Sequence, residues 1–270
     1  MYLEIGLTLL GLAVALMWIC FAVPDARGEV DPWEDFPTAR TIEFGGYAWR
    51  VKGSEDPAVT MGPGRFPFGP TEPSVWVDEQ GRLHLRVIEK DGVWYSAEVR
   101  LTEFLGHGDY RFTTVGRVDE VDPHLIFGLF LWEYQADYTG SETRNVANEF
   151  DIEFGNWDDP KRAPAQFVCQ PWQTADNLHP YWFDLEDDAA RSTHAFRWRP
   201  DAMDCRAWRG GPEAENDSEA RLTTWTYDGP DVPRGAPQVH LNLWCNRQPP
   251  ERGTPQEVII EKFEFVPWQP

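Results

Sequence analysis

Residues 148–154, near the middle of the chain, read Asn-Glu-Phe-Asp-Ile-Glu-Phe, so acidic and apolar side chains alternate. In a β-strand successive side chains point to opposite faces, which puts Glu149, Asp151 and Glu153 on one face and the apolar residues on the other. Neighbouring carboxylates repel each other and raise one another's pKa, so such a face is costly. The alternation therefore predicts a strand with its apolar face on a core and its acidic face free for chemistry.

Short strand-like segments recur along the chain, separated by turn residues. In the N-terminal half we expect strands at 41–44, 47–51, 74–77, 82–88 and 94–101, with a hairpin turn at Lys90-Asp91-Gly92. After residue 30 no segment of useful length has helical periodicity. With 270 residues and 41% hydrophobic content, the chain is long enough for one large domain. The pattern predicts an all-β sandwich.

The spacing of the three acids fits a two-carboxylate reaction. Residues i and i+4 of a strand are about 13 Å apart at Cα. Two Glu side chains that lean together can bring their carboxyl groups towards the roughly 5 Å separation of retaining glycoside hydrolysis. In that reaction one carboxylate attacks the anomeric carbon and the other protonates the leaving oxygen. Asp151 can share a proton with a flanking Glu, which keeps one carboxyl protonated and another ionised.

Glu-Phe-Asp-Ile-Glu at 149–153 resembles the Glu-x-Asp-x-Glu signature of glycoside hydrolase family 16. Between residues 104 and 268, flanking blocks at 127–132, 166–172, 194–201 and 241–244 resemble the same family in order and spacing. The resemblance implies a β-jelly roll of two antiparallel sheets with a concave substrate cleft. By position it implies that Glu149 is the nucleophile, Asp151 the assisting acid and Glu153 the general acid/base.

Aromatic and amide side chains are the candidate sugar contacts. Tryptophan faces stack on pyranose rings, and the chain has 14 Trp. The resemblance brings Trp132, Trp157 and Trp172 near the acids, with a core position as the alternative for each. Gln170 stands where many family members place a His or an aromatic residue, and Asn242 either hydrogen-bonds in the cleft or closes the sheet. Core positions are expected for Trp49, Trp94, Trp198 and Trp208.

Metal and disulfide signals are weak. The four cysteines include no Cys-x-x-Cys pair, and no calcium loop of the helix-loop-helix type is present. We expect no required cofactor, and a structural calcium, which is frequent in the family, stays open. Apart from Cys20, the cysteines Cys169, Cys205 and Cys245 allow at most one disulfide.

The apolar run from Ile5 to Val23 is 19 residues long, about 28 Å as a helix. It is either the core of a signal peptide or a transmembrane anchor, and its flanking charges do not decide between them. We therefore divide the chain into an N-terminal hydrophobic helix within residues 1–28 and a jelly-roll domain at 29–270. The expected location is secreted or extracytoplasmic, with membrane contact only through the N-terminal segment.

The formal net charge is −21. Such a surface repels nucleic acid and sulfated polysaccharide, whose binding needs Lys and Arg. The charge therefore excludes nucleic acid and favours a neutral glucan. The sequence predicts a monomeric retaining glycoside hydrolase that cleaves a β-1,3- or β-1,3/1,4-glucan. Two alternatives stay open: a catalytically silent, lectin-like carbohydrate-binding protein on the same fold, and a transglycosylase that uses the same residues.

Overall fold

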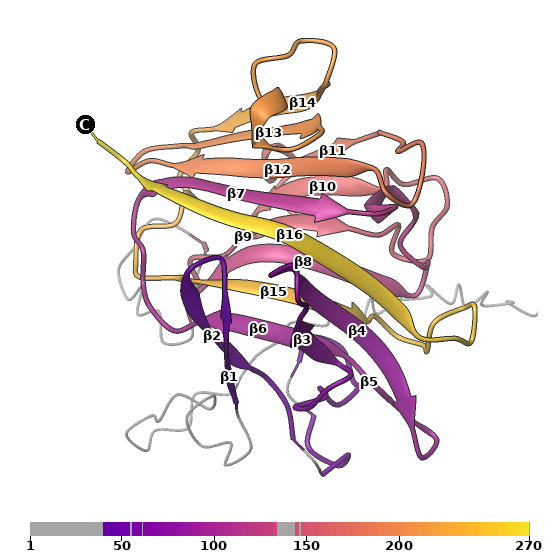
Figure 1. Cartoon of the computed structure of the whole chain (residues 1–270). Coiled ribbons are helices and arrows are strands. Elements are labelled where there is room, and N and C mark those ends of the chain that lie inside the picture. Colours follow the sequence, from indigo (N-terminus) through magenta and orange to yellow (C-terminus); the bar gives the residue numbers. More distant parts are fainter. Residues whose placement is uncertain (1–39, 55, 61, 134–143, 146, 270) are drawn as a thin grey trace, which may run out of the picture.

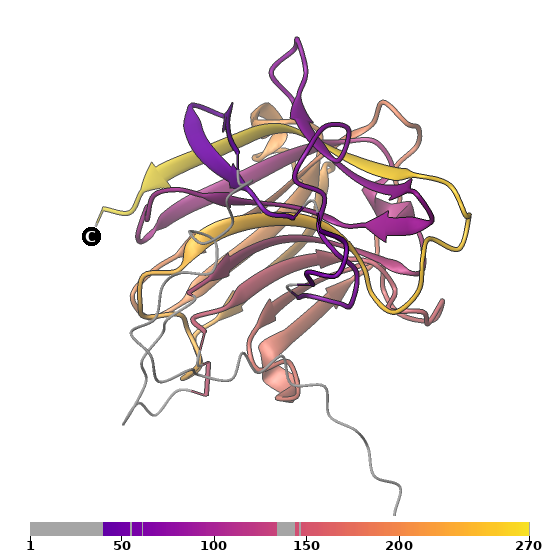
Figure 2. The same cartoon turned by 90° about the horizontal axis from the view of Figure 1, so that it is seen from below.

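The computed structural model describes residues 40–54, 56–60, 62–133, 144–145 and 147–269. Two antiparallel β-sheets form the molecule and pack face to face (Figures 1 and 2). The expected N-terminal helix and the boundary at residue 28 lie outside the described residues. Within the described ranges, no helix is long and apolar enough to cross a membrane.

The strand bounds follow the order in each sheet. The first sheet contains β1 (Thr41–Phe44), β2 (Tyr47–Val51), β6 (Ala97–Leu101), β15 (Gln238–Cys245), β8 (Leu125–Trp132), β9 (Phe150–Phe154), β10 (Ala165–Cys169) and β11 (Leu178–Tyr181). The second contains β14 (Arg221–Tyr227), β13 (Met203–Arg209), β12 (Arg191–Trp198), β7 (Gly108–Val115), β16 (Gln256–Pro267), β4 (Leu83–Lys90) and β3 (Val75–Val77), with β5 (Val93–Tyr95) paired to β4. Short 3-10 helices occur at Val118–Glu120, Ala175–Asn177 and Pro212–Ala214.

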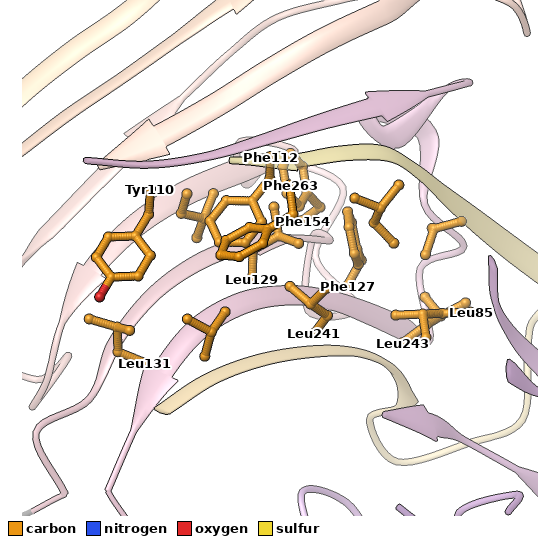
Figure 3. Close-up of a cluster of buried hydrophobic side chains, with 14 of the residues drawn as sticks. Leu85, Tyr110, Phe112, Phe127, Leu129, Leu131, Phe154, Leu241, Leu243 and Phe263 are labelled. Atoms are coloured by element: carbon orange, nitrogen blue, oxygen red, sulfur yellow. The ribbon is translucent and has the colours of Figure 1, made fainter. Parts of the chain in front are cut away.

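The core lies between the two sheets (Figure 3). Alternate residues of each strand point into it, as the period of two requires. Phe127 and Phe154, for example, come from neighbouring strands of the first sheet and stack at a ring-centroid distance of 5.0 Å. They lie across the core from Phe112 and Phe263 of the second sheet. Each fully buried Phe contributes about 1.5–3 kcal/mol relative to an exposed one.

The sequence-based expectations for the fold are largely confirmed. The first two expected strands match β1 and β2 at both ends, and Asp91 and Gly92 have positive φ in the turn between β4 and β5. The expected strand at 94–101 is split into β5 and β6. Trp49, Trp198 and Trp208 are buried as expected, whereas Trp94 is half-buried against the core. The cysteines Cys169, Cys205 and Cys245 are all buried free thiols.

The first sheet has a second face, which points away from the second sheet and is called the outer face below. It carries the residues that alternate with the core positions of β2, β6, β15, β8, β9 and β10. On β9 the core positions are Phe150, Ile152 and Phe154, all with no exposed surface. The acids of the alternating stretch are therefore held on the outer face, where they can meet a ligand.

Candidate active site

The three acids lie near the centre of the first sheet, where β9 is paired on both sides. Glu149 directly precedes β9, and Asp151 and Glu153 lie within it. Asp151 is 4% exposed, whereas Glu149 and Glu153 are half-buried. The apolar residues between them fix the strand's orientation, because turning the strand over would bury three carboxyls in the core. The sequence pattern therefore determines where this acidic cluster lies.

The backbone of Glu149 is held by the side chain of Asn145. The Glu149 N–H donates to Asn145 Oδ1 at 2.7 Å, and Asn145 Nδ2 donates to the Glu149 carbonyl at 2.8 Å. The same Nδ2 also donates to the carbonyl of Asp231 at 2.9 Å, which ties the turn to a distant segment. Two bonds to one residue restrict its backbone, so the Glu149 carboxyl starts from a fixed position. Sequence analysis missed Asn145, because no local pattern marks this bond.

A second contact braces the same turn. Asn148 has a φ of 49°, in the left-handed region that Asn tolerates better than most residues. Its Nδ2 donates to the Glu133 carboxylate, and its Oδ1 accepts the Arg234 N–H at 2.7 Å. A Cβ at Gly235 would collide with both Glu133 and Asn148, so this close approach requires glycine. The turn before the acids is therefore fixed from two directions.

Two glutamines of β10 contact the acids from the neighbouring strand. Gln166 lies directly opposite Glu153, and its Nε2 donates to Glu153 Oε2 at 2.5 Å. Gln170 Nε2 donates to Asp151 Oδ2 at 2.8 Å, and Gln170 Oε1 accepts the Trp172 N–H at 2.9 Å. Gln170 was among the expected site residues, and Gln166 was missed. Its position four residues before Gln170, on the same face of a strand, was the available signal.

Burial gives the three acids unusual acidities. It raises the pKa of Glu153 to about 7, although Gln166 and the charge of Arg162 act in the opposite direction. Burial and the charge of Glu153 raise the pKa of Glu149 to about 8, and a hydrogen bond from Asp151 opposes that rise. Burial and the two flanking glutamates hold the pKa of Asp151 well above its usual range. Near neutral pH the cluster therefore retains protons that isolated carboxyls would lose, and its members titrate together.

The expected tryptophans occupy different environments. Trp132 is the last residue of β8, half-buried and on the outer face next to Glu149. Trp172 is 56% exposed just after β10, and Trp182, which sequence analysis missed, is 65% exposed just after β11. Trp157 instead packs edge-on against Trp244 at 5.9 Å, within a small cluster that also contains Phe68 and Ile126. Only the first three present a face that a sugar ring could reach.

Asn242 lies two strands from Glu153 on the same cross-strand line. Gly128 is opposite both of them, and a Cβ at Gly128 would come within 2.6 Å of Asn242 Oδ1. Asn242 is 2% exposed, and its Oδ1 has no hydrogen-bond partner. A buried oxygen without a partner is costly, and a sugar hydroxyl above Gly128 would satisfy it.

The expected cleft and metal site lack direct evidence. A cavity of about 210 Å³ borders β13 and β14, in the sheet that does not carry the acids. Among the described residues no group of His, Cys, Asp and Glu side chains is arranged to hold a metal ion. The concave cleft stays a prediction, and a structural calcium has no candidate ligand set in the described part of the chain.

The fold and the acidic strand define a class: two antiparallel jelly-roll sheets, as in solved glycoside hydrolases and β-glucanases. A structure described as a native glycosidic hydrolase has a TM-score of 0.55 and 20% identity over 82% of this chain and 90% of its own. The β-glucanase of Bacillus licheniformis has a TM-score of 0.52 and 16% identity over 84% and 97%.

A third structure with this fold is an immunostimulatory antigen and pseudo β-1,3-glucanase of Mycobacterium tuberculosis. Its TM-score is 0.54, with 16% identity over 86% of this chain and 92% of its own. By sequence, no family model and no curated protein matches this chain. At these identities the likeness extends to the fold, and the chemistry has to be argued from the residues.

Proposed function

We propose that the protein is a retaining glycoside hydrolase that cleaves a β-1,3- or β-1,3/1,4-glucan. The observation that carries the proposal is the acidic cluster on the outer face of β9, with a separate amide partner for Asp151 and for Glu153. A merely solvated sheet face would not need buried carboxyls with raised pKa values, and such groups cluster at functional sites. The β-glucanases that share the fold support the choice of substrate.

In the proposed mechanism, each acid has one role. Asp151 donates a hydrogen bond to Glu149, which leaves negative charge on Glu149 for attack on the anomeric carbon. Glu153, whose pKa is raised to about 7, gives its proton to the leaving oxygen as the glycosidic bond breaks. A glycosyl ester of Glu149 results. Glu153 then takes a proton from water, which attacks the ester, releases the sugar with retained configuration and restores both acids.

The test is reducing-end release from laminarin, mixed-linkage glucan, xyloglucan and agarose by the full chain. We expect release from laminarin or mixed-linkage glucan, loss of release in Glu149→Gln, and normal release in the control Glu219→Gln, which changes an exposed residue of the other sheet's loops. Two further variants separate the roles. Glu149→Gly with azide should form a glycosyl azide, and Glu153→Gln should still cleave an aryl glycoside whose leaving group needs no proton.

The lectin-like alternative has one specific point in its favour: a pseudo β-1,3-glucanase shares the fold. Binding of one of these polymers without release, in wild type and Glu149→Gln alike, would establish it and refute the hydrolase. A transglycosylase would instead give products longer than the substrate, and Glu149→Gln would abolish them. Because polymeric glucan does not cross membranes, the proposed activity also agrees with the expected export.

A further inference from the structure

A row of side chains crosses the outer face from the acidic cluster towards the β1 edge of the first sheet. Asp151 lies opposite Phe130, Phe130 opposite His240, His240 opposite Arg100, and Arg100 opposite Arg50. Neighbouring strands are about 4.8 Å apart, so Arg100 and Arg50 lie about 14 and 19 Å from Asp151 across the sheet. That distance is longer than one sugar residue of a polymer lying along the row.

The middle of the row is an uncharged floor. The rings of Phe130 and His240 stack with centroids 4.9 Å apart. Both residues are under 10% exposed, as is Asn242 two residues further along β15. A glycan that leaves the acidic cluster in this direction would therefore pass over stacked rings before it meets the arginines.

The two arginines end the row as a pair of like charges. Arg50 and Arg100 lie directly opposite each other on β2 and β6, and both alternate with core residues, so both belong to the outer face. Like charges directly opposite on neighbouring strands are destabilising. Arg50 is half-buried, and its Nε is buried without a hydrogen-bond partner. An anion between the two guanidinium groups would relieve the repulsion and satisfy this nitrogen.

The acid nearest to this pair on β6 already has partners. Glu98 Oε2 forms an ion pair with Lys52 Nζ at 2.9 Å, and Glu98 Oε1 contacts His240 Nδ1 at 3.0 Å. Lys52 Nζ also donates to the Gly62 carbonyl at 2.6 Å. The charge of Glu98 is thus balanced by Lys52, and Arg50 stands outside this ion pair.

A second arginine shows which feature matters. Arg86 on β4 is also half-buried, and its Nε is also buried without a partner. It lies on the other sheet, however, and its cross-strand neighbour is the acid Glu257. An unsatisfied nitrogen alone is therefore no sign of a site. The distinguishing feature of Arg50 is its arginine neighbour in line with the acidic cluster.

We propose that Arg50 and Arg100 bind an anionic substituent of the glycan, a carboxylate or a sulfate, more than one sugar residue from the cleaved bond. Guanidinium groups bind such oxygens through parallel N–H donors. The inference rests on the proposed function, because it requires a glycan bound at the acidic cluster. It revises the expectation of a neutral glucan, which used the charge of the whole chain and could not locate a cationic end of one face.

The experiment compares neutral laminarin with carboxylated and with sulfated laminarin. Binding is measured by calorimetry with the full-length Glu149→Gln variant, and KM with the wild type. We expect the better charged polymer to bind about tenfold more tightly than the neutral one, with a preference that weakens as salt is added. Arg50→Gln should remove most of the preference, and the matched control Arg86→Gln should retain it. The charged polymer that binds better identifies the anion.

Three outcomes would overturn the inference: equal binding of neutral and charged laminarin, an unchanged preference in Arg50→Gln, or an equal loss in Arg86→Gln. Thermal unfolding of each variant verifies that it is folded. Failure of the two proposals looks different. Cleavage of neutral laminarin with no preference for charge keeps the hydrolase and refutes the anion site. A charge preference that depends on Arg50, without cleavage of any polymer by the wild type, keeps the anion site and refutes the hydrolase.

Discussion

Glu153→Gln should stabilise the protein at alkaline pH, at the cost of its proposed activity. Burial is the dominant reason that the pKa of Glu153 rises from 4.5 to about 7. At 1.36 kcal/mol per pKa unit, this rise corresponds to about 3 kcal/mol of unfavourable free energy for the charged form in the folded state. A glutamine is never charged, and its side-chain oxygen can still accept the hydrogen bond from Gln166.

The pH window follows from the direction of the shift. Between pH 4.5 and about 7 the folded protein still holds the Glu153 proton, whereas the unfolded chain has lost it. The free energy of unfolding of the wild type therefore falls as the pH rises through this window, and the loss is complete above it. The variant has no such loss. It should be about 3 kcal/mol more stable than the wild type at pH 9 and nearly equal to it at pH 4.

Denaturant unfolding of both proteins at pH 4 and pH 9 measures this difference directly. In a thermal scan at pH 9, the variant should melt about 6–12 °C higher, at about 2–4 °C per kcal/mol for a domain of this size. Glu219→Gln, an exposed change, should alter neither value. The reasoning would be refuted if Glu153→Gln stabilised the protein equally at both pH values, or if it destabilised it at pH 9.

Three further changes test the site. Asn145→Ala removes both hydrogen bonds to the Glu149 backbone, so kcat on laminarin should fall about tenfold or more with little change in KM, and an unchanged kcat would contradict the clamp. Gln166→Leu removes the amide that lowers the pKa of Glu153, so the alkaline limb of the kcat/KM profile, expected near pH 7, should move to higher pH; movement to lower pH would contradict the assignment. Trp172→Ala removes an exposed stacking face worth about 1 kcal/mol, so KM should rise several-fold while the melting temperature stays the same.

The parts of this fold that depend on local pattern were predictable. Alternation of apolar and polar residues located β1 and β2 at both ends, and a Lys-Asp-Gly turn marked the hairpin between β4 and β5. The same alternation placed Glu149, Asp151 and Glu153 on one face, because a period of two has only one way to bury three apolar residues. Gln170 was found for the same reason, since it follows a core strand at the correct parity.

The parts that depend on strand register were not predictable. His240 contacts Glu98 across 142 residues of sequence, and no turn connects their strands. The pairing of Arg50 with Arg100 is likewise a result of which strands become neighbours. Asn145 holds Glu149 through a side chain bonded to the backbone, a contact that any polar loop residue could make. A net charge of −21 also averages over the whole surface and conceals a cationic end of one face.

The position of the last two strands determines when this protein can fold. β15 lies between β6 and β8, and β16 lies between β7 and β4, so both belong to the interior of a sheet. Until residues 238–267 are available, four strands keep unpaired edges, which attract other chains. A chain emerging N-terminus first from a ribosome or a membrane pore therefore cannot close either sheet early, although its acidic strand has long been made. Folding should be a late, nearly all-or-none event, slow because of its long-range pairings, and fragments that end before β15 should aggregate.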